Sequence, residues 1–406
     1  DLKKIRQTRK EDSEAGKELL KKEIQTSNEL KAWWIDEMKT TEFPLREKMT
    51  LFWENHFVTA YQKVKVNYWI FQKNQLLREN AFGNFKTLTK KAMQTNAMVR
   101  YLDNVDNKKG KLNENLSREL LELFTLGIGN YSEADIKNGA KGLAGLGIGE
   151  TTAMYRRFLE DNDPIEYLGK KGVLKLDEMV DAIFDHPKIP YLLTQKILQW
   201  FLYDEPKENL VKHYGDYFRK VNFEIKPLLI KIFTEEFAKN DTAGSKIKNP
   251  LEYILLLTSE LKTQRPESTT IAFFLKQQGM DLFNPPNVKG WDGGKSWLTS
   301  QIYLQRNNVA DLLSSGKSIP RSKLERENTL NKKQAFSISL DWNTKGTNKE
   351  IIKELTDRLL FSTDTSLQQD LEKILKYDFD PQSLGANDAV LRLFNAIIKA
   401  PEFQLI

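Results

Sequence analysis

The sequence predicts a mainly α protein, a large multi-helix globular fold with at most a small β-hairpin near residues 153–168. Two observations predict this class. Apolar side chains recur every three or four residues along most of the chain, which is the period of an amphipathic helix. Alternation of apolar and polar residues, the pattern of a half-buried strand, is scarce.

The clearest helical pattern covers residues 44–64. Met49, Phe52 and Trp53 recur there on one face, which also carries His56 and Phe57. Pro44 suits a first helical position, where its missing N–H costs nothing. The same period predicts further helices over residues 115–126, 177–184, 191–202, 227–237, 251–261, 271–278, 349–360 and 389–398.

Strand signals and boundaries are few. Residues 153–168 contain two short β-prone runs on either side of the turn-prone residues 161–164. Residues 314–348 are low in apolar content, so we expect a surface excursion or linker there. The predicted organisation is a main helical domain over residues 1–313, this linker, and a closing helical segment over residues 349–406 packed on the main domain.

Composition excludes several classes of function. The chain has no cysteine, which rules out disulfides, thiolate metal sites and a cysteine nucleophile. No apolar run approaches the ~18 residues that a membrane span needs, and the charged first residues predict that no signal peptide remains in this chain. The net charge of +6 is spread along the chain and disfavours a nucleic-acid partner.

The densest polar cluster lies in residues 113–124. On a helix, Glu119 and Glu122 lie along one edge of a buried leucine stripe, beside Arg118. Such carboxylates form a general acid/base pair or a carboxylate metal site, completed by His56 from another helix. The alternative is a structural salt-bridge network in which Glu114 pairs with Arg118. In the same way, His56 is either catalytic or a hydrogen-bonded core residue. The sequence identifies no particular metal or cofactor.

A second candidate site is the loop at residues 282–297. Its Gly-Gly-Lys-Ser run lacks the first glycine of a phosphate-binding loop, so nucleotide binding is disfavoured. Asn287, Lys289, Trp291 and Trp297 offer amide, ammonium and aromatic groups that suit a sugar or a peptide. The alternative is that both Trp side chains fold inward as anchors. We expect Trp297 to be buried and Trp291 to line a cleft.

Four stretches carry a resemblance to a known family: residues 51–59 (LFWENHFVT), 113–136 (NENLSRELLELFTLGIGNYSEADI), 282–297 (LFNPPNVKGW and the following GG and W) and 400–404 (APEFQ). In this order they resemble the bacterial domain of unknown function 1800 family. The resemblance implies a predominantly helical fold and an extracytoplasmic setting, in the periplasm, at the cell surface or secreted. Relatives are often encoded beside a sulfatase-like family, and no reaction is established for them. The resemblance also implies that the family's N-terminal region is absent from this chain.

The family pattern also carries over to individual residues: His56, Asn113, Glu114, Asn115, Arg118, Glu119, Glu122, Asn287, Lys289, Gly290, Trp291 and Trp297. There are two departures. Relatives usually have a Trp after the helix that ends here at residues 142–146, and a His-Asp pair where this chain has residues 161–164. If that His is catalytic in relatives, this member is inactive or differently specialised.

These observations predict an exported hydrolase acting on a cell-surface or environmental polymer, with Glu114, Glu119, Glu122 and His56 in its site. The alternative is a non-catalytic module that binds a glycan or a secreted, sulfatase-like partner, and a purely structural envelope protein is a third reading. Convergence of His56, Glu119 and the loop on one open cleft would separate the first two.

Overall fold

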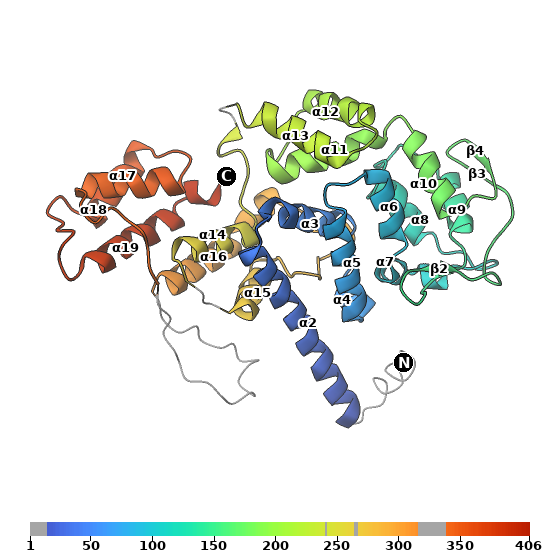
Figure 1. Ribbon diagram of the computed structural model, residues 1–406, viewed down its shortest axis with the longest axis horizontal. Coiled ribbons are helices and arrows are strands. Elements are labelled where there is room, and N and C mark those ends of the chain that lie inside the picture. Colours follow the sequence, from blue (N-terminus) through green and yellow to red (C-terminus); the bar gives the residue numbers. More distant parts are fainter. Residues whose placement is uncertain (1–13, 240–241, 264–266, 316–337) are drawn as a thin grey trace. The chain divides into compact units, whose positions relative to one another are not determined.

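The computed structural model describes residues 14–239, 242–263, 267–315 and 338–406. These residues are mainly helical, and the strands among them form two small two-stranded sheets, which confirms the predicted fold class (Figure 1). The chain divides into two compact units. Unit 1 comprises residues up to Lys239 together with Phe283–Trp291, and unit 2 comprises Asn240–Leu282 and Asp292–Ile406.

Unit 1 contains the longer run of helices. They are α2 (Glu14–Thr40), α3 (Pro44–His56), α4 (Tyr61–Val64), α5 (Asn67–Glu79), α6 (Phe85–Met93), α7 (Asn96–Tyr101), the 3-10 helix η1 (Asn104–Asp106), α8 (Asn115–Glu122), α9 (Glu133–Gly142), α10 (Leu176–Asp185), α11 (Ile189–Phe201), α12 (Glu208–Lys220) and α13 (Ile225–Glu236).

Helix α3 is largely buried and packs on α5 and α2. Pro44 occupies its first turn as predicted, and Met49, Phe52 and Trp53 are buried. The helix ends at His56, where the N–H of Phe57 bonds the carbonyl of Trp53 at 2.8 Å. The prediction of one continuous helix to residue 64 is therefore wrong, because the chain leaves the helix and re-enters one only at α4.

The strands of unit 1 are short and pair differently from the prediction. β2 (Met154–Tyr155) and β3 (Ile165–Tyr167) both fall within residues 153–168. They do not pair with each other, since β2 pairs with β1 (Leu146–Gly147) and β3 pairs with β4 (Lys170–Gly172), both antiparallel. Sheet β3–β4 lies beside α9 (Figure 1).

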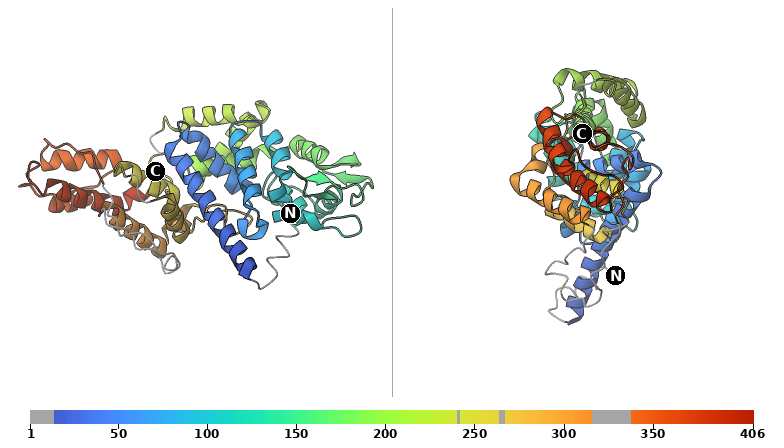
Figure 2. Two further views of the ribbon diagram at one scale, coloured as in Figure 1. Left: turned by 60° about the horizontal axis from the view of Figure 1, so that its bottom comes forward. Right: turned by 90° about the vertical axis from the view of Figure 1, so that its left-hand side faces the viewer.

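Unit 2 is helical throughout its described part. Its elements are α14 (Pro250–Glu260), α15 (Ser268–Gln277), the 3-10 helix η3 (Gly294–Leu298), α16 (Ser300–Ser314), α17 (Asn348–Leu359), α18 (Thr365–Ile374), α19 (Ala386–Lys399) and the 3-10 helix η5 (Glu402–Gln404). Helices α17, α18 and α19 pack against one another, and the left view of Figure 2 shows them in red.

The boundary between the units lies at residues 239–240, whereas the predicted domain boundary lies at 313–314. Helix α16, on the N-terminal side of that predicted boundary, packs on α19 and shares unit 2 with it. Most of the predicted linker, residues 316–337, lies outside the described residues. Within the described ranges, no helix combines the length and the apolar character that crossing a membrane requires.

Candidate functional site

Helix α8 carries the predicted carboxylates and is fixed by its contact with α9. Leu116, Ser117, Leu120 and Leu121 are its buried residues. The Ser117 hydroxyl donates to the carbonyl of Ile136 at 2.8 Å, and a Cβ on Gly139 would lie only 2.2 Å from the Ser117 oxygen. This close approach sets which edge of α8 is partly exposed, and that edge carries Glu119 and Glu122.

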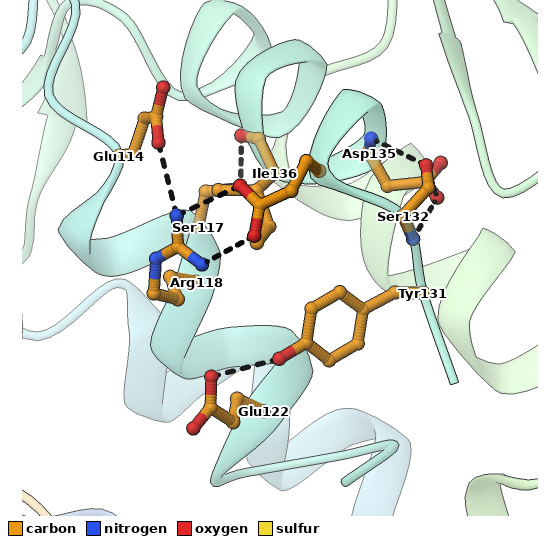
Figure 3. A network of polar contacts seen from close by, with 9 residues as sticks. Glu114, Ser117, Arg118, Glu122, Tyr131, Ser132, Asp135 and Ile136 are labelled. Atoms are coloured by element: carbon orange, nitrogen blue, oxygen red, sulfur yellow. Dashed lines mark hydrogen bonds and ion pairs between the residues drawn. The ribbon is translucent and has the colours of Figure 1, made fainter. Parts of the chain in front are cut away.

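Arg118 forms ion pairs with two acidic residues, Glu114 and Glu133. Its guanidinium donates to Glu114 at 3.3 Å, as the spacing of four residues predicts, and to both carboxylate oxygens of Glu133 at 3.0 and 3.1 Å. These bonds raise the pKa of Arg118, chiefly through Glu133. Because Arg118 and Glu114 satisfy each other, this end of the cluster forms a salt-bridge network, part of which Figure 3 shows. Glu133 was not among the residues predicted from the sequence.

Glu122 is held by a tyrosine. The Tyr131 hydroxyl donates to the Glu122 carboxylate at 2.8 Å (Figure 3). Burial, followed by the hydrogen bond to Glu122, raises the pKa of Tyr131 to about 12. Tyr131 therefore remains a neutral donor at physiological pH, and it orients one oxygen of Glu122. Tyr131 was also missed from the sequence.

Glu119 differs from its neighbours because it has no partner. It is partly buried, and no hydrogen bond or ion pair joins its carboxyl group to another described residue. Burial raises the pKa of Glu119, and the charge of Glu122 adds to this, while Arg118 and Lys289 act in the opposite direction. Glu119 is therefore a carboxyl group that holds its proton to higher pH than an ordinary glutamate.

The loop segment Phe283–Trp291 brings Lys289 to this carboxyl group. Its end is pinned on α3, where the Asn55 side-chain oxygen accepts the N–H of Trp291 at 2.7 Å. Gly290 has φ +90°, and a Cβ there would lie 2.2 Å from that Asn55 oxygen, so the position requires glycine. Asn287 accepts the N–H of Lys289 at 2.8 Å. Lys289 is exposed, and its charge acts on Glu119.

The two Trp side chains of the loop region are buried. Trp297, in unit 2, is 7% exposed, as expected for an anchor. Trp291, in unit 1, is 6% exposed, so the expectation that its ring lines an open cleft is wrong. Its indole N–H has no hydrogen-bond partner among the described residues. Neither ring offers a free face on which a sugar could stack.

His56 lies against the C-terminal end of α8 and not beside its carboxylates. Its ring Nε2 donates to the carbonyl of Phe124 at 3.0 Å, and Lys196 approaches Nδ1 at 3.4 Å. Burial, followed by the charge of Lys196, lowers the pKa of His56 well below 6.5. His56 is therefore a neutral, hydrogen-bonded core residue, which is the alternative that the sequence left open. Burial also lowers the pKa of Lys196 to about 8.

The metal alternative finds no support. Among residues 14–239, 242–263, 267–315 and 338–406, no three histidine or acidic side chains are grouped so that they could hold a metal ion. Glu114 and Glu122 each face a cationic or hydroxyl donor, which fits an ion-pair network and not a ligand shell.

Comparison with protein families matches residues 1–405 to the family described as a protein of unknown function (DUF1800). The match spans nearly the whole chain, so the protein belongs to this family. Comparisons with curated proteins and with solved structures give no match.

Proposed function

We propose that this protein is an extracytoplasmic hydrolase that cleaves a cell-surface or environmental polymer by acid–base catalysis. Glu119 is the general acid and Glu122 is the paired carboxylate. The observation that carries the proposal is the state of Glu119, which is partly buried, unpartnered, raised in pKa and next to a second carboxyl group.

Glu119 and Glu122 fit the two different roles that hydrolysis of a glycosidic or similar bond requires. A general acid must be protonated near neutral pH and must have a free oxygen for the leaving group, and burial beside a second negative charge favours that state. The partner carboxylate must be held in one orientation, which the Tyr131 hydroxyl does for Glu122. The two roles thus rest on two different environments along one helix.

Lys289 adds a positive charge beside the acid. Its ammonium group is exposed and acts on the charge of Glu119, so it is placed to bind substrate oxygens or to stabilise negative charge that develops on them. Because Lys289 and Asn287 are exposed and Glu119 is partly so, an extended substrate can reach them from solvent. The extracytoplasmic setting rests on the family resemblance, and immunodetection in fractionated cells tests it.

The matched pair Glu119→Gln and Glu114→Gln tests the chemistry. Both changes remove one carboxylate from α8, and Glu114 belongs to the salt-bridge network. We expect Glu119→Gln to lower hydrolysis roughly 100-fold or more, and Glu114→Gln to leave it within a few-fold. The readout is reducing-end release from neutral and acidic polysaccharides and amine release from peptidoglycan. Equal losses in the two variants would contradict the assignment of Glu119.

The alternative is a non-catalytic module that binds a glycan or a secreted partner. Its support is the pinned loop, which presents the exposed Lys289 at a fixed position. Wild-type protein that binds a polymer without cleaving it, together with Lys289→Ala protein that no longer binds, would favour this alternative.

A further inference from the structure

Unit 1 contains a polar pocket, formed by the end of α7, η1 and the β1–β2 sheet. It has a volume of about 240 Å³, and its walls include Arg100, Arg156, Asp106 and the segment 145–148. Glu119 and Glu122 are not among its lining residues. The pocket is therefore separate from the proposed hydrolytic site.

The walls are held rigidly. Asn104 and Asn107 are each 1% exposed. Asn104 donates to the carbonyls of Leu143 and Leu146, and Asn107 donates to Asn104 and to the carbonyl of Ala140. Gly145 has φ +82°, and a Cβ there would lie 2.8 Å from the backbone nitrogen of Glu160. A site framed in this way is largely formed before any ligand arrives.

The charged groups of the pocket are left largely without partners. Arg100 is partly buried, and its guanidinium makes no hydrogen bond or ion pair within the described residues. Arg156 donates to one carbonyl, that of Ile148, at 3.1 Å. Asp106 is exposed and forms no ion pair with the described part of the chain. Two guanidinium groups against one carboxylate leave an excess of one positive charge.

We propose that this pocket binds a hydroxylated carboxylic acid of the size of a sugar acid. The guanidinium fork matches a carboxylate in two parallel hydrogen bonds, and the excess of one charge matches a monoanion. Asp106 supplies an acceptor for hydroxyl groups. A cavity of roughly 150 Å³ holds a benzene-sized ring, so the larger pocket has room for a six-membered ring with its substituents.

Isothermal titration of the full chain with glucuronate tests the proposal, with glucose, glucose 6-phosphate and inorganic phosphate as the comparison probes. We expect saturable binding of glucuronate that weakens with added salt, and no binding of glucose. Arg100→Gln and Arg156→Gln should each weaken glucuronate binding roughly 10- to 100-fold. Arg157→Gln removes the same charge from the neighbouring position, which does not line the pocket, and should bind like the wild type.

Arg100→Lys serves as a variant that keeps the charge and removes the fork, and it should also weaken binding. Each variant is compared with the wild type by thermal midpoint, so that a folding defect is recognised. The proposal is overturned by an absence of glucuronate binding to the wild type, by equal binding in the Arg100 variants, or by a loss in Arg157→Gln of the same size. Tighter binding of either phosphate compound than of glucuronate would overturn the carboxylate assignment.

Discussion

Two glutamates of unit 1, Glu54 on α3 and Glu119 on α8, differ in their burial and in the partners of their carboxyl groups. Glu54 is 5% exposed and accepts from the Lys73 ammonium at 2.6 Å and from Asn74 at 3.3 Å. Lys73 is itself fully buried, and Thr59 accepts its second hydrogen bond at 3.0 Å. Glu119, only partly buried, has no such partner.

The difference separates a structural carboxylate from a reactive one. A buried charge is tolerated when its lone pairs are satisfied, as those of Glu54 largely are, and removing either partner then exposes the other to the full cost of burial. An unpartnered carboxyl group costs stability in its charged form, so it is retained where its proton has a use. Four measurements test this difference between the two glutamates.

The largest effect is expected from Glu54→Leu. The change leaves the Lys73 ammonium buried without a counter-ion, which costs about 3–5 kcal/mol. The thermal midpoint should fall by roughly 10 °C or more. The double variant Glu54→Leu with Lys73→Met removes both charges and should recover much of the loss. If the thermal midpoint of Glu54→Leu did not change, Glu54 would not be a structural carboxylate. Its difference from Glu119 would then disappear.

His56→Leu is expected to come next in size. It removes the donor to the carbonyl of Phe124 and leaves that carbonyl unsatisfied, at a cost of about 1–3 kcal/mol. Because His56 has no contact with the carboxylates of α8, binding and hydrolysis per folded molecule should not change. Urea unfolding with the polymer assay measures both. A loss of activity without a loss of stability would return His56 to the catalytic site.

Glu119→Gln should change how stability depends on pH. It should leave the stability at low pH unchanged. The raised pKa means that the native state holds this proton more tightly than the unfolded chain does. Wild-type stability is therefore highest below the ordinary glutamate range and falls as the pH rises from there through the raised pKa. The variant lacks this fall, so it should be at least as stable as the wild type at about pH 7.

Urea midpoints of Glu119→Gln and wild type, followed from about pH 4 to about pH 7, measure this difference. Parallel curves would show that Glu119 does not titrate abnormally, and the proposed general acid would lose its basis.

The smallest effect is expected from Arg118→Gln. Arg118 and Glu133 are 36% and 68% exposed, so water and salt screen their ion pair. The expected loss of stability is within about 1 kcal/mol and should shrink at high ionic strength. A loss comparable to that of Glu54→Leu would show that the network on α8 is as structural as the buried pair.

Local features of the fold were predictable, and partners distant in sequence were not. Pro44 and the apolar spacing that follows it predicted the start of α3, but its end at His56 was missed. Phe57 and Val58, which follow it, are apolar and fully buried, so they continue the periodic pattern although the backbone has left the helix. The β-prone runs on either side of residues 161–164 likewise located β2 and β3, but they do not encode which strands these two pair with.

The candidate site shows the same difference between contacts within one helix and contacts between segments. Glu114 and Arg118 share one helix, so their spacing was sufficient to predict their contact. Tyr131 and Glu133 belong to the following segment, and only the close packing of α8 on α9 brings them to Glu122 and Arg118. A signal was present in Ser132 and Asp135, whose capping box starts α9 a short connection after α8. Nothing in the sequence showed that Glu119 would remain unpaired.

The insertion of Phe283–Trp291 into unit 1 determines how this chain can be dissected. The residues on either side of the insertion belong to unit 2, so unit 1 is discontinuous in sequence. Phe283 stacks on the buried Trp34 at 4.9 Å between ring centroids, and its carbonyl accepts the N–H of Tyr61 at 2.9 Å. A fragment ending at Lys239 would leave Trp34 uncovered, whereas the same fragment supplied with the nine-residue peptide in trans would regain both its hydrophobic cover and Lys289.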